Sequence, residues 1–400
     1  MDSLKPNRIP KDVRALGWVS FFTDISGEMI YPLLPVFLSG VLGASAVALG
    51  LIEGIAEATA SLTKVYSGAW ADRVSRRKPL IGLGYVVSAI AKPCIGFATS
   101  WVAVLSLRFF DRIGKGVRTG PRDALIADLS HSDHRGAAYG FHRAMDHAGA
   151  VLGPVVASLL FLIPGMNLRN VFILTVVPGV IAVLILTYGV KDRVRPVKKS
   201  AKSGVVWGDF KNLGGDFRWL LVAVFIFTLG NSTDAFLLIR LSEVGIPTGT
   251  VALLWSVHNA VKMVSTYYGG RFADRIGRRI MIALAWVVFS ATYFGFAVFS
   301  AREPLILIFL FYGFHYGLSE PAERAWIADL APIGLRGTAF GIYHFTVGLG
   351  ALPASILFGF ISKYYGSFYA FMTGAVLALI ASLVLFAVQR TALKPRFTGS

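Results

Sequence analysis

Charged residues recur along one face of the segment RFFDRIGKGVRTGPRD, which runs from Arg108 to Asp123. At 100° per residue on an α-helix, its charged side chains fall within an arc of about 140°. These side chains are Arg108, Asp111, Arg112, Lys115, Arg118, Arg122 and Asp123. The opposite side carries Phe109 and Phe110. Such a helix directs its charges at protein or water, where they can pair with acids or bind an anionic group.

Three cations of this charged stripe, Arg108, Arg112 and Lys115, are expected to lie deepest, and they outnumber the acids beside them. We predict that Arg112 and Lys115 bind a substrate and that Arg108 takes part in proton coupling. The other four charged residues of the stripe are interpreted as structural ion pairs.

Two pairs of acids occur at i and i+4 in the preceding segments. Asp24 and Glu28 form the first pair, and Glu53 and Glu57 form the second. Residues four apart lie on the same face of a helix. A buried carboxylate that gains and loses an arginine partner can take up and release a proton. We therefore predict proton coupling by Asp24 and Glu28 opposite Arg108. Glu53 and Glu57 are predicted to contact substrate, with pairing to nearby lysines as the alternative.

Histidines and further acids are candidates for substrate contact. His142 and Asp146 form another i,i+4 pair, and Asp234 and His315 lie in the second half of the chain. We predict that all four contact substrate. Imidazole and carboxylate groups also suit nickel, cobalt or iron, so a transition-metal exporter is the alternative function. Its candidate ligands are His142, His147, His258, His315, Asp24 and Glu28. Excess positive charge in the same region argues against that alternative.

Long apolar segments position these residues. Hydrophobic residues make up 55% of the 400-residue chain and charged residues 15%, against about 25% charged in a soluble domain. Runs such as Val171–Val190 are long enough to cross a hydrocarbon core of about 30 Å. We therefore predict an all-α membrane protein with twelve transmembrane helices in two pseudo-symmetric six-helix bundles. The helices are expected near 14–38, 46–71, 79–98, 101–129, 136–162, 168–190, 217–240, 248–272, 278–299, 304–330, 337–362 and 366–389.

The two halves of the chain repeat each other. GAWADRVSRRK at 68–78 returns as GRFADRIGRRI at 270–280, which places Asp72 and Asp274 202 residues apart. The tetrapeptide IADL at 126–129 returns at 327–330, 201 residues later. A chain of two similar membrane-spanning halves is typical of transporters built from parallel repeats.

These loops resemble the G-x-x-x-D-R-x-G-R-R/K motif of the major facilitator superfamily, with Ser75 in place of the usual glycine of the first copy. The resemblance implies that Asp72, with Arg73 and Arg77, holds the start of the eleventh helix near Gly337 and gates transport. The gating residues of the second copy would be Asp274 and Arg275.

The segment Gly149-x-x-x-Gly153-Pro154 resembles the fifth-helix motif of antiporters in this superfamily. The resemblance implies a gating role for these three residues and favours export. Glycines four apart also permit close contact between membrane helices.

Basic residues set the expected orientation. They gather before the first helix, in the repeated loops, in the segment 191–212 and in the C-terminal tail, while the opposite loops are nearly uncharged. Cytoplasmic loops carry such an excess, so we expect both termini in the cytoplasm of a bacterium and the protein in its inner membrane. The predicted domains are an N-terminal bundle at 1–190, a linker at 191–216 and a C-terminal bundle at 217–400.

The predicted function is secondary active transport by alternating access, with proton-coupled export of a small anionic or zwitterionic molecule. The chain contains no G-x-x-x-x-G-K-[ST] loop for ATP. We expect no enzymatic activity, no cofactor, no resident metal and no nucleic-acid partner. The expected partners are protons, a small-molecule substrate and the lipid bilayer, and the expected state is a monomer.

Overall fold

The computed structural model of this protein describes residues 9–44, 46–191, 194 and 213–386. These residues form helices that are joined by short turns. None of the described residues lies in a β-strand. Most of the predicted linker falls outside the described residues, as do Lys5, Arg8 and the basic residues of the C-terminal tail.

The first half begins with one helix that is continued by short helical turns. Its elements are α1 (Lys11–Glu28), η1 (Tyr31–Leu33), α2 (Leu34–Val36), η2 (Phe37–Val41), α3 (Ala46–Arg73), α4 (Lys78–Cys94), η3 (Ile95–Phe97), α5 (Trp101–Leu129), η4 (Ser132–His134), α6 (Arg135–Leu160), α7 (Leu168–Leu174) and α8 (Val176–Gly189). With α1 to η2 as one pass and α7 with α8 as another, this half makes six passes.

The second half has the same order. Its elements are α10 (Gly214–Gly230), α11 (Ala235–Glu243), α12 (Thr248–Ile276), α13 (Arg278–Val298), α14 (Arg302–Leu330), η6 (Ile333–Leu335), α15 (Arg336–Tyr365) and α16 (Ser367–Phe386). With α10 and α11 as one pass, it also makes six. The predicted helices agree with these elements except in the first pass of each half, which is broken.

The two breaks occupy equivalent positions. α1 ends at Glu28 and α10 ends at Gly230, which are 202 residues apart, the same spacing as that of the repeated loops. The residues Asn231–Asp234 between α10 and α11 are not helical. Discontinuous helices expose backbone and polar side chains near the middle of a membrane, where transporters bind their substrates.

Seven of the described helical stretches are long and apolar enough to cross a membrane. They are 78–97, 168–189, 214–243, 278–298, 302–330, 333–365 and 367–386. The other long helices, α1, α3, α5, α6 and α12, carry most of the charged residues discussed above. Because charge facing lipid is costly, these helices must turn their charges toward the interior.

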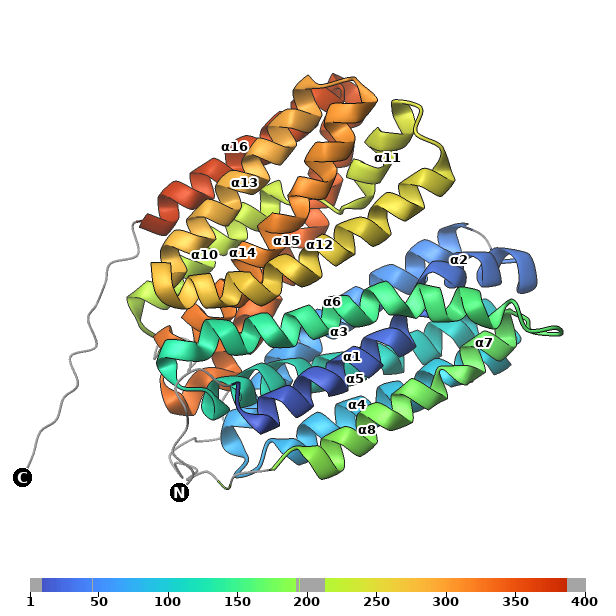
Figure 1. Cartoon of the computed structure of the whole chain (residues 1–400), viewed down its shortest axis with the longest axis horizontal. Coiled ribbons are helices and arrows are strands. Elements are labelled where there is room, and N and C mark those ends of the chain that lie inside the picture. The colour runs from blue at the N-terminus through green and yellow to red at the C-terminus, as the bar shows by residue number, and fades with distance from the viewer. Residues whose placement is uncertain (1–8, 45, 192–193, 195–212, 387–400) are drawn as a thin grey trace, which may run out of the picture.

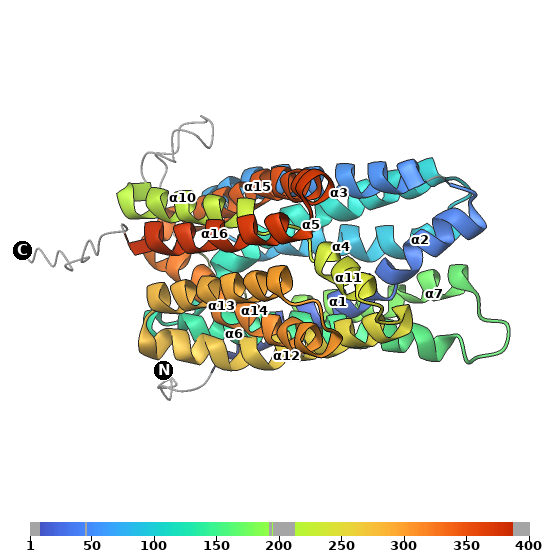
Figure 2. The same cartoon turned by 90° about the horizontal axis from the view of Figure 1, so that it is seen from above.

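The two halves lie side by side and converge at one end (Figure 1), the end with the repeated loops 68–78 and 270–280. We call it the closed end, and it lies at the left in Figure 1. Two helix pairs join the halves there: α3 with α15, and α6 with α12. We call these contacts the α3–α15 seam and the α6–α12 seam. Seen from above in Figure 2, α3, α15 and α10 gather along one edge of the molecule.

Glycines make both seams possible. A methyl group at Gly68 would collide with the carbonyl oxygen of Gly337, and one at Gly270 would collide with that of Gly136. Backbones at this distance leave no room for any side chain, so the seams require glycine where the helices cross.

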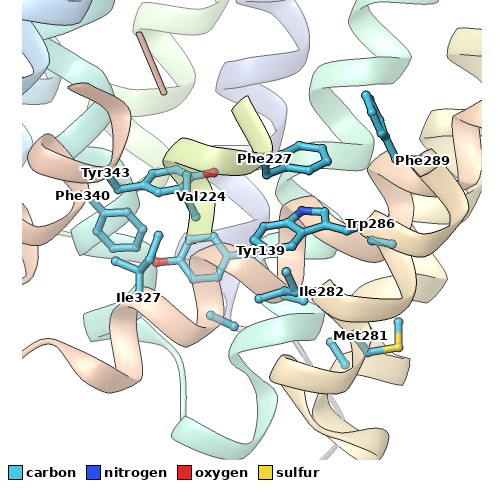
Figure 3. Packing of buried hydrophobic residues seen from close by; sticks show 14 of the residues in the cluster. Tyr139, Val224, Phe227, Met281, Ile282, Trp286, Phe289, Ile327, Phe340 and Tyr343 are labelled. Carbon is cyan, nitrogen blue, oxygen red and sulfur yellow. The ribbon is translucent and has the colours of Figure 1, made fainter. Parts of the chain in front are cut away.

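Buried aromatic residues complete the packing beside the seams (Figure 3). The rings of Phe227 and Trp286 stack with centroids 4.8 Å apart, and Phe289 meets Phe227 edge to face at 4.9 Å. Tyr139 of the first half contacts Phe340 of the second at 6.0 Å. Tyr139 also donates a hydrogen bond of 2.6 Å to the carbonyl oxygen of Asp123. The closed end is therefore sealed by an apolar layer as well as by polar contacts.

We expect Gly270→Leu to hold the α6–α12 seam apart, because the new side chain would overlap the backbone of Gly136. Spin labels at His131 and Ile276, in a Cys94→Ala background, should then report a longer distance across the closed end. Gly54→Leu is the matched control, since a methyl group at Gly54 meets no atom within 4 Å. An unchanged distance in Gly270→Leu would show that the seam tolerates a side chain.

Candidate substrate cavity and closed end

A cavity of about 270 Å³ lies inside the first half, between α1, α3, α4 and α5. Its charged lining residues are Asp24, Glu28, Glu57, Lys92, Arg108, Asp111, Arg112, Lys115 and Arg118. The cavity thus brings together the predicted proton-coupling residues, the two predicted substrate-binding cations and one of the two predicted acids of α3.

Helix α5 directs its charged stripe inward. Arg108, Asp111 and Arg112 are buried, whereas Phe109 and Phe110 on the opposite side are 38% and 53% exposed. Gly114 lets α5 approach α4 closely, because a methyl group there would lie 2.6 Å from the carbonyl oxygen of Gly84. The hydrophobic pattern of α5 and this close crossing fix which way the stripe faces.

The arginines of α5 pair with acids of α3. Arg108 Nη2 lies 2.6 Å from Glu53 Oε1, and Arg112 Nη2 lies 3.7 Å from Glu57 Oε1. Arg108 Nη1 is also 3.9 Å from Asp111 Oδ2. From the sequence, we expect the acids of α1 to lie opposite Arg108. In the described conformation the acids of α3 take that place.

Several charged groups of the cavity are left without such partners. Within the described part of the chain, the carboxylates of Asp24 and Glu28 and the ammonium of Lys115 make no hydrogen bond or ion pair. The Nε atoms of Arg108 and Arg112 are buried and unpartnered as well. Because buried polar groups in proteins are normally hydrogen-bonded, this arrangement suits a polar ligand.

The glycine motif of α6 lies directly behind the α1 acids. A methyl group at Gly153 would lie 2.6 Å from Glu28 Cβ, and one at Gly149 would lie 3.0 Å from Asp24 Cβ. Helix α6 continues without a break through Pro154. The motif therefore sets how closely α1 and its two acids approach α6.

His142 and Asp146 belong to a polar network that joins the halves, and neither lines the cavity. Arg143 binds Glu320 of α14 through two hydrogen bonds of 2.7 Å and Asp146 through one of 2.5 Å. His142 Nε2 lies 2.9 Å from Ser20 Oγ. No sequence pattern predicts a role for Glu320, because its partner Arg143 is 177 residues away in the chain.

The second half holds a smaller charged cluster around Asp234. Its carboxylate accepts hydrogen bonds of 3.1 Å from Tyr312 and 3.0 Å from Tyr316, and it lies 3.6 Å from Lys262 Nζ. His315 is buried: its Nδ1 lies 2.9 Å from the carbonyl oxygen of Ala285, and the centroid of its ring lies 5.3 Å from that of Phe227. Over the described residues, no group of three or more His, Cys, Asp and Glu side chains is placed to hold a metal ion.

Asp72 caps a helix of the other half at the closed end. Its carboxylate accepts hydrogen bonds of 2.9 and 2.7 Å from the backbone N–H groups of Gly337 and Thr338, the first turn of α15. Arg77 forms ion pairs with both Asp72, at 2.8 Å, and Asp128, at 2.6 Å. Asp128 forms a further ion pair of 2.7 Å with Arg336. The contact predicted between Asp72 and the start of the eleventh helix is present.

The same cluster recurs at the α6–α12 seam. Asp274 accepts hydrogen bonds of 2.8 Å from the backbone N–H groups of both Gly136 and Ala137 at the start of α6. Arg278 contacts Asp274 and Asp329. The partner of Asp274 is thus Arg278, whereas Arg275 is exposed. The repeated motifs of the sequence therefore build two equivalent locks.

Each lock places a negative charge on the N-terminus of a helix in the other half. Unpaired N–H groups and the helix dipole favour an anion there by about 0.3–1 kcal/mol when exposed and more when buried. The side chain of Asp72 is only 5% exposed, and that of Arg77 is fully buried. Removing one partner of a buried ion pair leaves an uncompensated charge and costs about 3–5 kcal/mol, so the loss of either partner should destabilise this conformation.

We expect Asp72→Asn to open the α3–α15 seam, since the amide loses its charge toward Arg77 and offers one acceptor oxygen instead of two. Spin labels at Ser75 and Ile333, in a Cys94→Ala background, should show the closed-end distance lengthen in at least about a tenth of molecules. Glu243→Gln, an exposed acid at the other end of the molecule, is the control. An identical distance distribution in Asp72→Asn would refute the lock.

Comparison with known proteins identifies the family. The model of the Major Facilitator Superfamily matches residues 16–244 and 220–399. An uncharacterized MFS-type transporter of Methanocaldococcus jannaschii is 33% identical over 383 residues, covering 94% of this chain and 94% of that protein. The cis,cis-muconate transport protein of Acinetobacter baylyi is 23% identical over 337 residues, covering 80% and 79%. The crystal structure of the E. coli fucose:proton symporter FucP has a TM-score of 0.79 at 15% identity, covering 95% and 98%. This chain therefore belongs to the Major Facilitator Superfamily and is a multi-pass membrane transporter.

Proposed function

We propose that this transporter carries out proton-coupled export of a small zwitterionic or anionic molecule, by alternating access. The observation that carries the proposal is the cavity of the first half, where the unpartnered acids of α1 share the lining with the unpartnered ammonium of Lys115 and with the unpartnered Nε atoms of Arg108 and Arg112. Both kinds of charge are available to a ligand in one small space.

The charge of the cavity supports this substrate class. Its lining has five basic and four acidic side chains, so its formal charge is +1 when all are ionised. Protonation of Asp24 and Glu28 would raise the charge to +3. Because Coulomb interactions are much stronger in a medium of low dielectric constant than in water, a permanent cation would be disfavoured there.

The direction of coupling follows from which groups the ligand needs. A ligand carboxylate that pairs with Arg112 and Lys115 binds best when Asp24 and Glu28 are protonated. Such a ligand therefore favours movement of the anion and the proton together. An ammonium group binds best when those acids are ionised, so it competes with protons. By linkage, a zwitterion whose ammonium group pairs directly with the ionised carboxylates of Asp24 and Glu28 releases protons as it binds. A zwitterion therefore suits a proton-driven exporter best, as the antiporter motif at Gly149, Gly153 and Pro154 suggests.

The excess of basic residues in the repeated loops supports a cytoplasmic position for the closed end and for both termini, in the inner membrane of a bacterium. In that orientation the conformation described here faces outward. Two bundles, at 1–190 and 217–400, would rock about the cavity within a monomer. Asp72, Arg73 and Arg77 would gate one seam, and Asp274 and Arg275 the other.

A relative supports an organic substrate. The protein of Acinetobacter baylyi is named for transport of cis,cis-muconate, which is a dicarboxylate. A metal cargo has less support, because the cavity carries a net positive charge and metal-binding clusters are absent from the described part of the chain.

Replacing Arg112 and Lys115 together with Gln should weaken ligand binding about tenfold or more and reduce its salt dependence, because two cations of the cavity are lost. Thermal-shift titrations with cis,cis-muconate, amino acids, tetraphenylphosphonium and Ni²⁺ measure this. Arg14→Gln, an exposed arginine of α1, is the control. If the wild type binds only tetraphenylphosphonium or Ni²⁺, and the double variant binds it more tightly, the proposed substrate class is wrong.

Replacing Asp24 with Asn and Glu28 with Gln should abolish transport driven by a pH gradient and spare substrate exchange, because the carrier can no longer exchange protons. Proteoliposomes loaded with the best ligand of the titrations allow both measurements. Glu303→Gln, an exposed acid outside the cavity, should leave both unchanged. Full uphill transport by the double variant would remove these acids from the mechanism.

A further inference from the structure

A hollow of about 780 Å³ lies on the outside of the α3–α15 seam, between α3, α10 and α15. Among the described residues, its walls are apolar apart from two arginines and a threonine, and none of the residues that line it is acidic. Tyr66, Val222 and Leu349 on its walls are 70%, 44% and 54% exposed. Exposed side chains of this kind on a membrane protein face lipid, so we call the hollow the lipid-facing groove.

Two arginines stand at one end of the lipid-facing groove. Arg73 is the last residue of α3, and Arg218 lies one turn into α10, so both are at the closed end. Arg218 is exposed, and its Nε donates a hydrogen bond of 3.3 Å to the carbonyl oxygen of Gly214 in its own helix. A cationic mouth on an apolar groove fits a molecule with an anionic head and an apolar tail.

The length of the groove fits one leaflet of a bilayer. Its lining on α3 runs from Leu62 to Arg73, and the eleven steps between these two residues correspond to about 16 Å along a helix axis. Half of a hydrocarbon core of about 30 Å is about 15 Å. The groove therefore reaches from the membrane surface to the middle of the bilayer, the depth that one acyl chain occupies.

We propose that the lipid-facing groove binds an anionic phospholipid, with its phosphate between Arg73 and Arg218 and one acyl chain along the groove. Phospholipid is favoured over free phosphate because most of the site is apolar. Of the family assignment, the proposed lipid site requires only that the protein spans a membrane. The further assignment of this lipid to the cytoplasmic leaflet, where anionic lipids attract arginines, rests on the proposed orientation.

The groove joins the two halves of the transporter. Its walls combine α3 of the first half with α10 and α15 of the second, so it exists in this form only while the seam is closed. A ligand shifts a conformational equilibrium by its difference in affinity between the two states. The bound phospholipid therefore stabilises the closed end alongside the Asp72 lock.

Native mass spectrometry of the purified protein titrated with phosphatidylglycerol or phosphatidylcholine tests binding. We expect phosphatidylglycerol to bind more tightly and its Kd to rise roughly 30-fold when Arg73 and Arg218 are both replaced with Gln, at about 1 kcal/mol per arginine. Arg14→Gln, another exposed arginine near the same end of the molecule, should leave the Kd unchanged. Equal affinity for the two lipids, or an unchanged Kd in the double variant, would overturn the proposal.

Two further outcomes would also overturn it. Displacement of phosphatidylglycerol by millimolar inorganic phosphate would make the site a phosphate site. A dimer that Val222→Trp dissociates would assign the groove to a second copy of the chain. The proposal instead predicts that Val222→Trp excludes the acyl chain from a monomer and that phosphate does not compete.

The conformational effect is measured separately, with spin labels at Ser75 and Ile333 in nanodiscs. Phosphatidylglycerol should increase the fraction of wild-type molecules that have the short distance across the closed end. It should leave that fraction unchanged in the double variant. The same response to phosphatidylcholine would refute a specific lipid effect. None of these measurements needs a transport substrate, so their failure and that of the proposed export reaction are distinguishable.

Discussion

The structure depends on one interaction made twice: a buried carboxylate of one half accepts hydrogen bonds from the first turn of a helix in the other half. Asp72 does this for α15, and Asp274 does it for α6. The contact works only because glycines let the helix backbones touch at the same point. Two locks at one end hold the bundles together there, and both rely on groups that can be released without breaking either bundle.

The cost of charge in a membrane explains where the polar residues are. A cation facing lipid would destabilise α5, so its stripe must face acids, water or a ligand. Glu53 and Glu57 satisfy part of that need. The unpartnered remainder, in Asp24, Glu28 and Lys115, is concentrated in one cavity. A protein built for stability alone would gain from removing these groups, so their retention is consistent with use during transport.

Part of the site followed from the sequence, and part did not. The repeated loops predicted Asp72 at the start of the eleventh helix, and the hydrophobic period predicted which face of α5 points inward. The partners of the arginines were not predictable in the same way. Arg108 and Arg112 meet α3 in this conformation, and Asp274 pairs with Arg278 while Arg275 is exposed. Helix period gives the direction of a side chain but not the neighbouring helix that faces it.

The sequence by itself determined the helices apart from the break in the first pass of each half, their two-fold repetition and the face on which each charge lies, because these depend on local period and on the cost of polar groups in lipid. Only the tertiary structure decided which charges pair, since partners such as Asp72 and Thr338 are 266 residues apart. It also decided that α3, α10 and α15 enclose a groove with two arginines at its mouth. Such contacts depend on how the two bundles meet, which local sequence patterns do not specify.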